Sequence, residues 1–257
     1  MKVALKFGYI GFHFHGFARQ PTVPTVEGTL IEKLIEREII DSVKEAEIRS
    51  ASRTDKHVSA LSNVMTFYSN KSAKDILFSL SDEFDAIFPY GITKVNDDFN
   101  PRFANSRLYQ YLLPPHQYSI KKLQNALYLF EGEHDFSNFA RLEYHRNPVR
   151  IIDKISILEK KNTVAIQIKA QTFLWNQIRR ILQAAIKYCN NSISLDQIKH
   201  ALQKPNMPVD FNIAPAPPLI LTNIDYQNLH FFEPNLLKER ISFIESTVER
   251  YITNLVF

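Results

Sequence analysis

The sequence of 257 residues is short of cysteine and glycine, and each shortage is informative. The single cysteine, Cys189, excludes an intramolecular disulfide and any metal site built only from cysteines. Only six glycines occur, and four of them (Gly8, Gly11, Gly16 and Gly28) lie in the first 28 residues. Because glycine allows close backbone approach and positive φ, this clustering predicts a special loop near the N-terminus.

Long apolar runs are also missing. No stretch approaches the roughly 20 apolar residues that span a bilayer. No segment has the charged start, apolar middle and small-residue cleavage site of a signal peptide. We therefore expect a soluble, cytoplasmic protein with no membrane partner.

The usual motifs of cofactor chemistry do not appear either. Neither GxxxxGK[ST] nor GxGxxG after a strand occurs, and the GxSxG nucleophile elbow is absent. His13 and His15 would share one face of a strand, but no third metal ligand follows at a spacing typical of a zinc site. We interpret His134 and Asp135 as a pair that satisfies a loop backbone. The sequence thus predicts no cofactor and no metal.

Aromatic and apolar residues are plentiful, with 19 Phe, 11 Tyr and an apolar fraction of 45%, so a sizeable core is possible. The 31 Lys and Arg exceed the 27 Asp and Glu, which gives a formal net charge of +4. This mildly basic balance permits an RNA partner without requiring one.

Hydrophobic periodicity predicts an α+β protein in which strands and helices alternate in mixed order. Thr25 is expected to cap the helix that begins at Val26, and Ser194 to cap a later one. The two halves have a similar element order, which predicts two similar subdomains, 1–103 and 104–257. The expected strands are 2–10, 45–52, 59–69, 86–97, 106–114, 149–160, 162–173 and 219–226, and the expected helices are 26–40, 72–84, 117–132, 174–189, 194–203 and 233–252.

The stretch "SASRTDKHVSA", residues 50–60, is dense in charge between two apolar segments. Taken alone, Asp55 is typical of a surface turn. However, Arg53 and Lys56 on either side favour its ionised form, and an ionised carboxylate in a basic cleft suits nucleophilic attack or proton abstraction.

This stretch resembles the GRTDxGVHA signature of the tRNA pseudouridine synthase A family, and six further segments match family motifs in the same order over almost the whole chain. They are "YIGFHFHGFARQ" (9–20), "TVEGTLIEKL" (25–34), "FNPRFANSRLYQYLL" (99–113), "EGEHDFSNFAR" (131–141), "QTFLWNQIRRIL" (171–182) and "APAPPLIL" (214–221). The departures are Ser52 and His57 in place of glycines, Ser59 in place of a histidine, and Pro218 in place of the glycine before Leu219. These changes put the loop conformation and the substrate choice in question more than the chemistry.

The resemblance implies that the protein isomerises uridine to pseudouridine in tRNA. The family's usual targets are positions 38 to 40 of the anticodon stem-loop, and it acts as a homodimer. In this reaction the bond from ribose C1′ to base N1 breaks, the base rotates, and C1′ rejoins at C5. The resemblance also implies two subdomains that share an extended antiparallel sheet flanked by helices, with a basic cleft around Asp55.

Roles carry over from the family residue by residue. Asp55 would be the catalytic carboxylate, and its attack on the sugar or base and its removal of the C2′ proton both remain open. Tyr109 would stack on the extruded uracil, Arg179 would pair with Asp55, and Leu219 would line the pocket. Arg53 would enter the RNA stem where the base leaves. The other expected RNA contacts are Lys56, Arg19, Arg102, Arg141, Arg146 and Arg180.

Three alternatives stay open from the sequence. The protein could perform the same isomerisation at another tRNA site, it could bind or fold tRNA with little catalysis, or it could use Asp55 as a hydrolase. Mapping pseudouridine by mass spectrometry in treated tRNA distinguishes them.

Overall fold

A computed structural model describes residues 1–81 and 86–254, except for the side chains of residues 236–238. The chain forms two compact units. The first consists of Met1–Asn105 and Ile220–Tyr251, and the second consists of Ser106–Leu219 together with the C-terminal residues from Ile252. The chain therefore returns to its first unit after Leu219. The subdomains predicted from the sequence, 1–103 and 104–257, follow one another along the chain and do not include this return.

The first unit contains a mixed sheet in the strand order β4-β1-β3-β9, with β2 also paired to β3. Strands β1 and β3 pair antiparallel, as do β1 and β4, but β3 and β9 run parallel, with Ser59 opposite Ile220. The expected antiparallel sheet is therefore present, with the short β3–β9 pairing as its parallel exception. The reason for the exception is that β9 reaches β3 through the whole second unit, so no tight hairpin fixes its direction. The bounds are β1 (Lys2–Tyr9), β2 (Arg49–Ser50), β3 (Ser59–Tyr68), β4 (Ile87–Lys94) and β9 (Leu219–Asp225).

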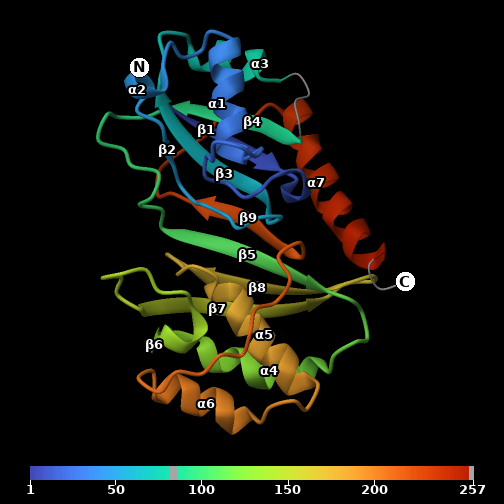
Figure 1. Ribbon diagram of the computed structural model, residues 1–257. Coiled ribbons are helices and arrows are strands. Elements are labelled where there is room, and N and C mark those ends of the chain that lie inside the picture. The colour runs from blue at the N-terminus through green and yellow to red at the C-terminus, as the bar shows by residue number, and fades with distance from the viewer. Residues whose placement is uncertain (82–85, 255–257) are drawn as a thin grey trace. The chain divides into compact units, whose positions relative to one another are not determined.

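Four helices belong mainly to the first unit, and α1 lies in front of β1 and β3 in Figure 1. Thr25 caps α1 as the sequence predicts, because its side chain accepts a hydrogen bond from the Gly28 backbone. The expected strand 45–52 shrinks to two residues, since residues 43–46 form a helix capped by Ser42. The expected helix 72–84 ends at Ser79, and its residues 82–84 lie outside the described ranges. The helices are α1 (Val26–Glu36), α2 (Val43–Ala46), α3 (Ala73–Ser79) and α7 (Asn235–Asn254).

Strand β1 is buried on both of its faces. On one face, the rings of Phe7, Tyr9 and Phe17 lie within 6.1 to 6.4 Å of one another, and all three are almost completely buried. On the other face, the Cα of Gly8 lies close to the side chain of Ile244 in α7, because a Cβ at that glycine would stand 2.5 Å from it. Successive residues of a strand point to opposite faces, so β1 is the centre of this unit's core.

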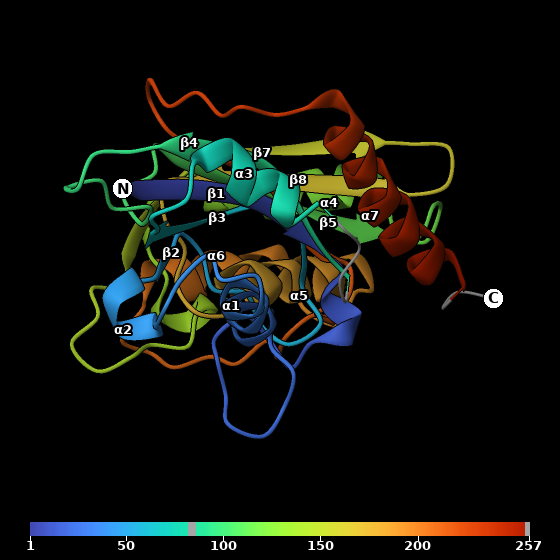
Figure 2. The same cartoon turned by 90° about the horizontal axis from the view of Figure 1, so that it is seen from above.

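The second unit contains an antiparallel sheet in the order β5-β8-β7-β6. The expected hairpin is confirmed, since β7 and β8 pair from Ile152 opposite Ala170 to Glu159 opposite Val164. Helices α5 and α6 lie on one side of β7 and β8 (Figure 2), and Ser194 caps α6 as expected. The bounds are β5 (Ser106–Leu113), α4 (Ile120–Leu127), β6 (Gly132–Asp135), β7 (Val149–Glu159), β8 (Val164–Ala170), α5 (Gln177–Cys189) and α6 (Leu195–Gln203).

The glycine-rich segment after β1 packs directly on the backbone that follows Asp55. A Cβ on Gly11, which begins the short 3-10 helix η1 (Gly11–His13), would stand 2.3 Å from the carbonyl oxygen of Val58. Gly16 adopts a φ of +105°, and a Cβ there would stand 3.4 Å from the backbone nitrogen of Lys56. The sequence predicted a special loop near the N-terminus from the distribution of glycines. This loop is present, and it contacts residues 54–58.

This close approach makes Gly11→Ala a sharp test of the packing. We expect the substitution to lower the free energy of unfolding by at least about 1–3 kcal/mol, because the new methyl group would meet rigid backbone. Urea unfolding of the purified variant measures it.

Gly28→Ala is the matched control, since its Cβ would meet side-chain atoms and no backbone: the Thr25 hydroxyl oxygen at 2.8 Å and Arg19 Cγ at 3.8 Å. There a helix-propensity gain of about 1 kcal/mol offsets the disturbed cap, so we expect little net change. Equal losses in both variants would contradict the close approach at Gly11.

Candidate active site

The loop around Asp55 is fixed by hydrogen bonds on both sides of the carboxylate. The Ser52 carbonyl accepts from the side-chain amide of Asn63 at 3.0 Å. The Thr54 hydroxyl shares a 2.8 Å hydrogen bond with the buried Tyr9 hydroxyl, and the Thr54 carbonyl accepts from the Phe17 backbone at 3.1 Å. These bonds hold the backbone before Asp55, and Asp55 itself is half-buried.

A tight turn follows the carboxylate. The backbone N–H of Val58 donates to the carbonyl of Asp55 at 3.2 Å, and His57 adopts a φ of +68° between them. Glycine is the residue that this conformation favours, and the family signature has glycine here. Histidine therefore occupies a left-handed position in a turn that is closed by a backbone hydrogen bond.

Ser59, where the family signature has histidine, also has a structural partner. Its side-chain oxygen accepts a buried hydrogen bond of 2.9 Å from the backbone N–H of Gly11. The end of the Asp55 loop is thus attached to the same glycine that packs on Val58. This departure from the signature keeps the two segments joined.

Two exposed cations adjoin Asp55 in sequence. Arg53 and Lys56 both have exposed side chains, and Arg19 and Arg102 elsewhere in the first unit are exposed as well. The backbone N–H of Arg19 donates to Glu27, whose carboxylate also accepts from Ser50. Glu27 thereby links the loop before α1 to the start of the Asp55 loop.

In the second unit, Tyr109 lies on β5 with 8% of its surface exposed. Its ring meets that of Phe173 edge to face, with centroids 5.3 Å apart and planes at 88°. This contact fixes the plane of the tyrosine ring. Two residues on, Tyr111 is buried and donates from its hydroxyl to the carbonyl of Pro215 at 3.2 Å.

Arg179 is held by the segment that precedes Leu219. Its Nε donates to the Ala214 carbonyl at 2.8 Å, and its own carbonyl accepts from the Ala214 backbone at 3.1 Å. The carbonyl of Pro218 accepts from Leu112 of β5 at 3.1 Å. Residues 214–219 therefore connect the Arg179 turn of α5 with the strand that carries Tyr109.

The pKa of Tyr111 reflects the presence of Arg179 near it. Burial raises the pKa of Tyr111 above its ordinary value, and the positive charge of Arg179 opposes that rise. Tyr111 therefore stays protonated and acts as a hydrogen-bond donor. The second unit contains Tyr109, Arg179 and Leu219, three of the residues expected at the site.

The remaining basic candidates differ in their surroundings. Arg141 is exposed and stacks over the ring of Trp175 at 4.0 Å. Arg180 forms an ion pair with Asp210 at 2.9 Å, and Arg146 approaches Glu143 at 3.7 Å. RNA phosphates would have to compete with a carboxylate at these last two positions.

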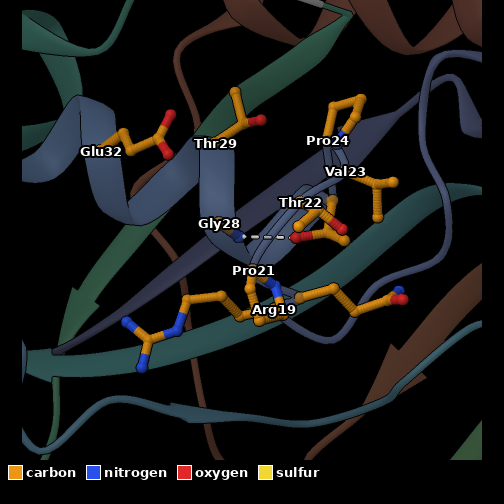
Figure 3. Close-up of a pocket in the computed structure, with 10 residues that line it drawn as sticks. Arg19, Pro21, Thr22, Val23, Pro24, Gly28, Thr29 and Glu32 are labelled. Atoms are coloured by element: carbon orange, nitrogen blue, oxygen red, sulfur yellow. Dashed lines mark hydrogen bonds between the residues drawn. The ribbon is translucent and has the colours of Figure 1, made fainter.

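A cavity of about 520 Å³ lies in the first unit between the loop that precedes α1 and the first turns of that helix (Figure 3). Its wall includes Arg19 and Glu32, but Asp55 is not among its lining residues. Its position therefore differs from that of the expected uracil pocket. The other lining residues are Gln20, Pro21, Thr22, Val23, Pro24, Thr25, Gly28 and Thr29.

The interpretation of His134 and Asp135 as a structural pair is confirmed. Asp135 accepts from the backbone and hydroxyl of Ser137, and His134 bonds the carbonyl of Glu131 at 2.9 Å. Within the described ranges, no group of three or more His, Cys, Asp or Glu side chains is arranged to hold a metal ion. Across the same ranges, no helix is long and apolar enough to cross a membrane.

Sequence reasoning missed one contributor, Trp175, and predicted for Tyr9 only that it shapes the loop. Tyr9 lies in the opening family motif, but only the folded chain brings its hydroxyl to Thr54. Trp175 is the only tryptophan of the chain, and its 44% exposure could have been suspected from its place between a loop and a helix.

Comparisons with known proteins agree on one class of enzyme. Residues 126–227 match the family described as "tRNA pseudouridine synthase". A protein from Thermococcus sibiricus named tRNA pseudouridine synthase A is 40% identical over 235 residues, which cover 90% of this chain and 87% of the relative. One of the same name from Pyrococcus furiosus is 36% identical over 254 residues, covering 98% of this chain and 92% of the relative.

A solved structure titled "Crystal Structure of a Cbf5-Nop10-Gar1 Complex" aligns with 95% of this chain and 59% of that one. The TM-score of this overlap is 0.38, at 14% sequence identity.

The sequence matches place the protein among the pseudouridine synthases, which are isomerases, and the α+β fold and enzyme class expected from the sequence are confirmed. At this identity and coverage, the chain belongs to the tRNA pseudouridine synthase A family. The pairing of Asp55 with Arg179 and the individual roles of the site residues stay predictions.

The turn at His57 predicts a specific pH dependence of stability. Burial, and secondarily the charge of Lys56, lower the pKa of His57 below its ordinary value of 6.5, although a hydrogen bond with the Phe12 backbone opposes this. Below that value the unfolded chain binds a proton that the folded chain does not. Stability therefore falls as pH drops through this range.

His57→Asn keeps a residue that tolerates positive φ but cannot titrate. We expect the urea midpoint of the variant to change less between pH 7.5 and pH 5.5 than that of the native protein. Parallel pH profiles of the two proteins would refute the contribution of His57.

Proposed function

We propose that the protein isomerises uridine to pseudouridine in tRNA, at the anticodon stem-loop, with Asp55 as the catalytic carboxylate. The anchoring of the Asp55 loop supports the proposal most. Hydrogen bonds from Asn63, Tyr9 and Phe17 fix the residues just before the carboxylate, and a turn fixes those just after it. A carboxylate held in this way can meet a nucleotide with little loss of entropy.

The reaction needs a carboxylate, a sheltered pocket and a path for the base. Asp55 attacks the sugar or base, or removes the C2′ proton, and the bond between C1′ and N1 breaks. The base turns and its C5 bonds to C1′. In the same step the bond from Asp55 to the sugar or base breaks, or the proton returns to C2′, so the free carboxylate is regenerated. The C5 proton then leaves and a proton is bound at N1, so that atoms and charge balance without any redox step.

Tyr109 has the environment that a stacking residue requires. The edge-to-face contact with Phe173 orients its ring, and 8% of the surface of Tyr109 is exposed. A uracil stacked on this ring would be held close to its hydroxyl. The hydroxyl could then help to remove the C5 proton.

Arg179 is proposed to pair with Asp55 and keep it ionised, with Leu219 on the pocket floor. Both residues are positioned by the 214–219 segment, so the guanidinium and the pocket wall would move together. A charge-assisted pair of this kind also restricts the rotamer of the carboxylate.

Basic residues would offset the cost of extruding a base, which is a few kcal/mol. Exposed Arg53 would fill the gap in the stem, and exposed Lys56, Arg19, Arg102 and Arg141 would contact phosphates. For each phosphate contact, the logarithm of the tRNA association constant falls more steeply with the logarithm of the salt concentration, by about one unit of slope. Arg146 and Arg180 would first leave their carboxylate partners. The homodimer and the cytoplasmic location also belong to this proposal.

Asp55→Asn tests the central role while preserving side-chain size. We expect pseudouridine formation in tRNA to fall by at least about 10³-fold, as loss of an essential catalytic group does. Binding of tRNA should change little. Mass spectrometry of treated tRNA measures the product and its position.

Asp98→Asn is the control, since Asp98 is an exposed carboxylate of the same unit. Full activity of Asp55→Asn would reject the proposal. Free uracil or cleaved RNA among the native products would instead indicate hydrolysis, and tRNA binding without any product would indicate a binding protein.

Arg179→Ala tests the pairing separately. We expect kcat to fall about 100-fold with an unchanged Kd for tRNA, because a misplaced carboxylate costs turnover rather than binding. Arg179→Lys should recover only part of the rate, since lysine lacks the planar fork.

Lys187→Ala, in the last turn of the same helix, controls for loss of positive charge. Thermal unfolding checks that the bond between Arg179 and Ala214 is not essential for folding. A native kcat in folded Arg179→Ala would refute the positioning role.

A further inference from the structure

An exposed pair of stacked side chains lies at the start of α5. The guanidinium of Arg141 stands 4.0 Å from the centre of the Trp175 ring, and the Arg141 backbone N–H donates to the Trp175 carbonyl at 2.8 Å. Arg141 is exposed and 44% of Trp175 is accessible. The planar guanidinium of Arg141 is therefore held over the indole ring of Trp175, and both residues are open to solvent.

A second aromatic surface lies on the same loop, three residues further on. Tyr144 is 91% exposed, and its ring centre is 3.7 Å from that of His145. Three residues span at most about 11 Å of chain, so the Cα atoms of Tyr144 and Arg141 are no further apart than that. We refer to Arg141, Tyr144, His145 and Trp175 as the aromatic platform.

The loop that carries the platform has a defined conformation. The backbone N–H of Arg146 donates to the Glu143 carbonyl at 3.0 Å, and His145 between them has a φ of +59°. Asn147 accepts from the Val149 backbone at 2.9 Å at the start of β7. Tyr144 is carried by this turn and its ring is exposed to solvent.

The positive charge of the loop formed by residues 141–150 indicates what kind of partner it binds. Residues 141–150 contain three arginines and one glutamate. Burial and the neighbouring charge of Arg146 lower the pKa of Arg150, so the positive charges stand close together. A basic loop with exposed aromatic rings has the composition of surfaces that bind single-stranded nucleic acid.

We infer that the aromatic platform stacks unpaired bases of the RNA substrate, outside the pocket for the reacting uridine. One base would stack on the outer face of the Arg141 guanidinium and a neighbouring base on Tyr144. At about 3.4 Å of rise per stacked nucleotide, two or three nucleotides span the two surfaces. The inference rests on the proposed function, since tRNA provides such bases in its loops.

The single tryptophan provides a direct test. Because Trp175 is the only tryptophan in the chain, intrinsic fluorescence at the indole wavelength reports on the platform alone. Titration of the protein with a short oligouridylate, and separately with tRNA, should quench or shift this emission in a saturable way. Polyphosphate at the same charge concentration should have little effect, since it carries no bases.

Tyr144→Ala should weaken oligouridylate binding by about five- to hundred-fold, the range for loss of one stacked base. For tRNA, it should raise KM and leave kcat within about twofold. Tyr144→Phe should restore binding, because stacking needs the ring and not the hydroxyl. Tyr128→Ala, an exposed tyrosine at the end of α4, is the matched control and should bind as the native protein does.

Asp55→Asn separates this inference from the proposed function. That variant should lose isomerisation yet retain the full fluorescence response. If the native protein forms pseudouridine but RNA leaves the emission unchanged, the platform is refuted and the function stands. Equal responses to polyphosphate and RNA, native binding by Tyr144→Ala, or a response to anionic lipid vesicles and not to RNA would also overturn it.

Discussion

The close contact between the N-terminal glycine loop and the backbone after Asp55 is the constraint on which the rest of the first unit depends. Gly11 approaches Val58 so closely that no side chain fits, and its N–H is bound by Ser59. The carboxylate is therefore positioned by contacts with the main chain before any substrate arrives. Such preorganisation leaves little ordering to be done when RNA binds.

The second unit positions its residues by a different means. Segment 214–219 accepts hydrogen bonds from Arg179, Tyr111 and Leu112, and so joins a helix to a strand. Three of its six residues are proline, which fixes φ and lowers the entropy lost on ordering the segment. Pro218, where the family motif has glycine, fits this role because only its carbonyl is used.

The departures from the family signature have local structural partners. Ser59 bonds Gly11, and His57 occupies the left-handed position of a turn that keeps its hydrogen bond. Both residues thus take part in the contacts that hold the Asp55 loop. On the surface of the second unit, Arg141, Tyr144 and Trp175 offer planar groups to a partner.

The sequence by itself determined the features that depend on neighbouring residues. The cap at Thr25, the hairpin of β7 and β8, the α+β class and the family motif around Asp55 follow from local pattern. Only tertiary structure decided the parallel pairing of β3 with β9, the bond from Tyr9 to Thr54 and the stacking of Arg141 on Trp175. The physical reason is that these contacts join residues 34 to 161 positions apart, and periodicity carries no information about which distant segments will meet.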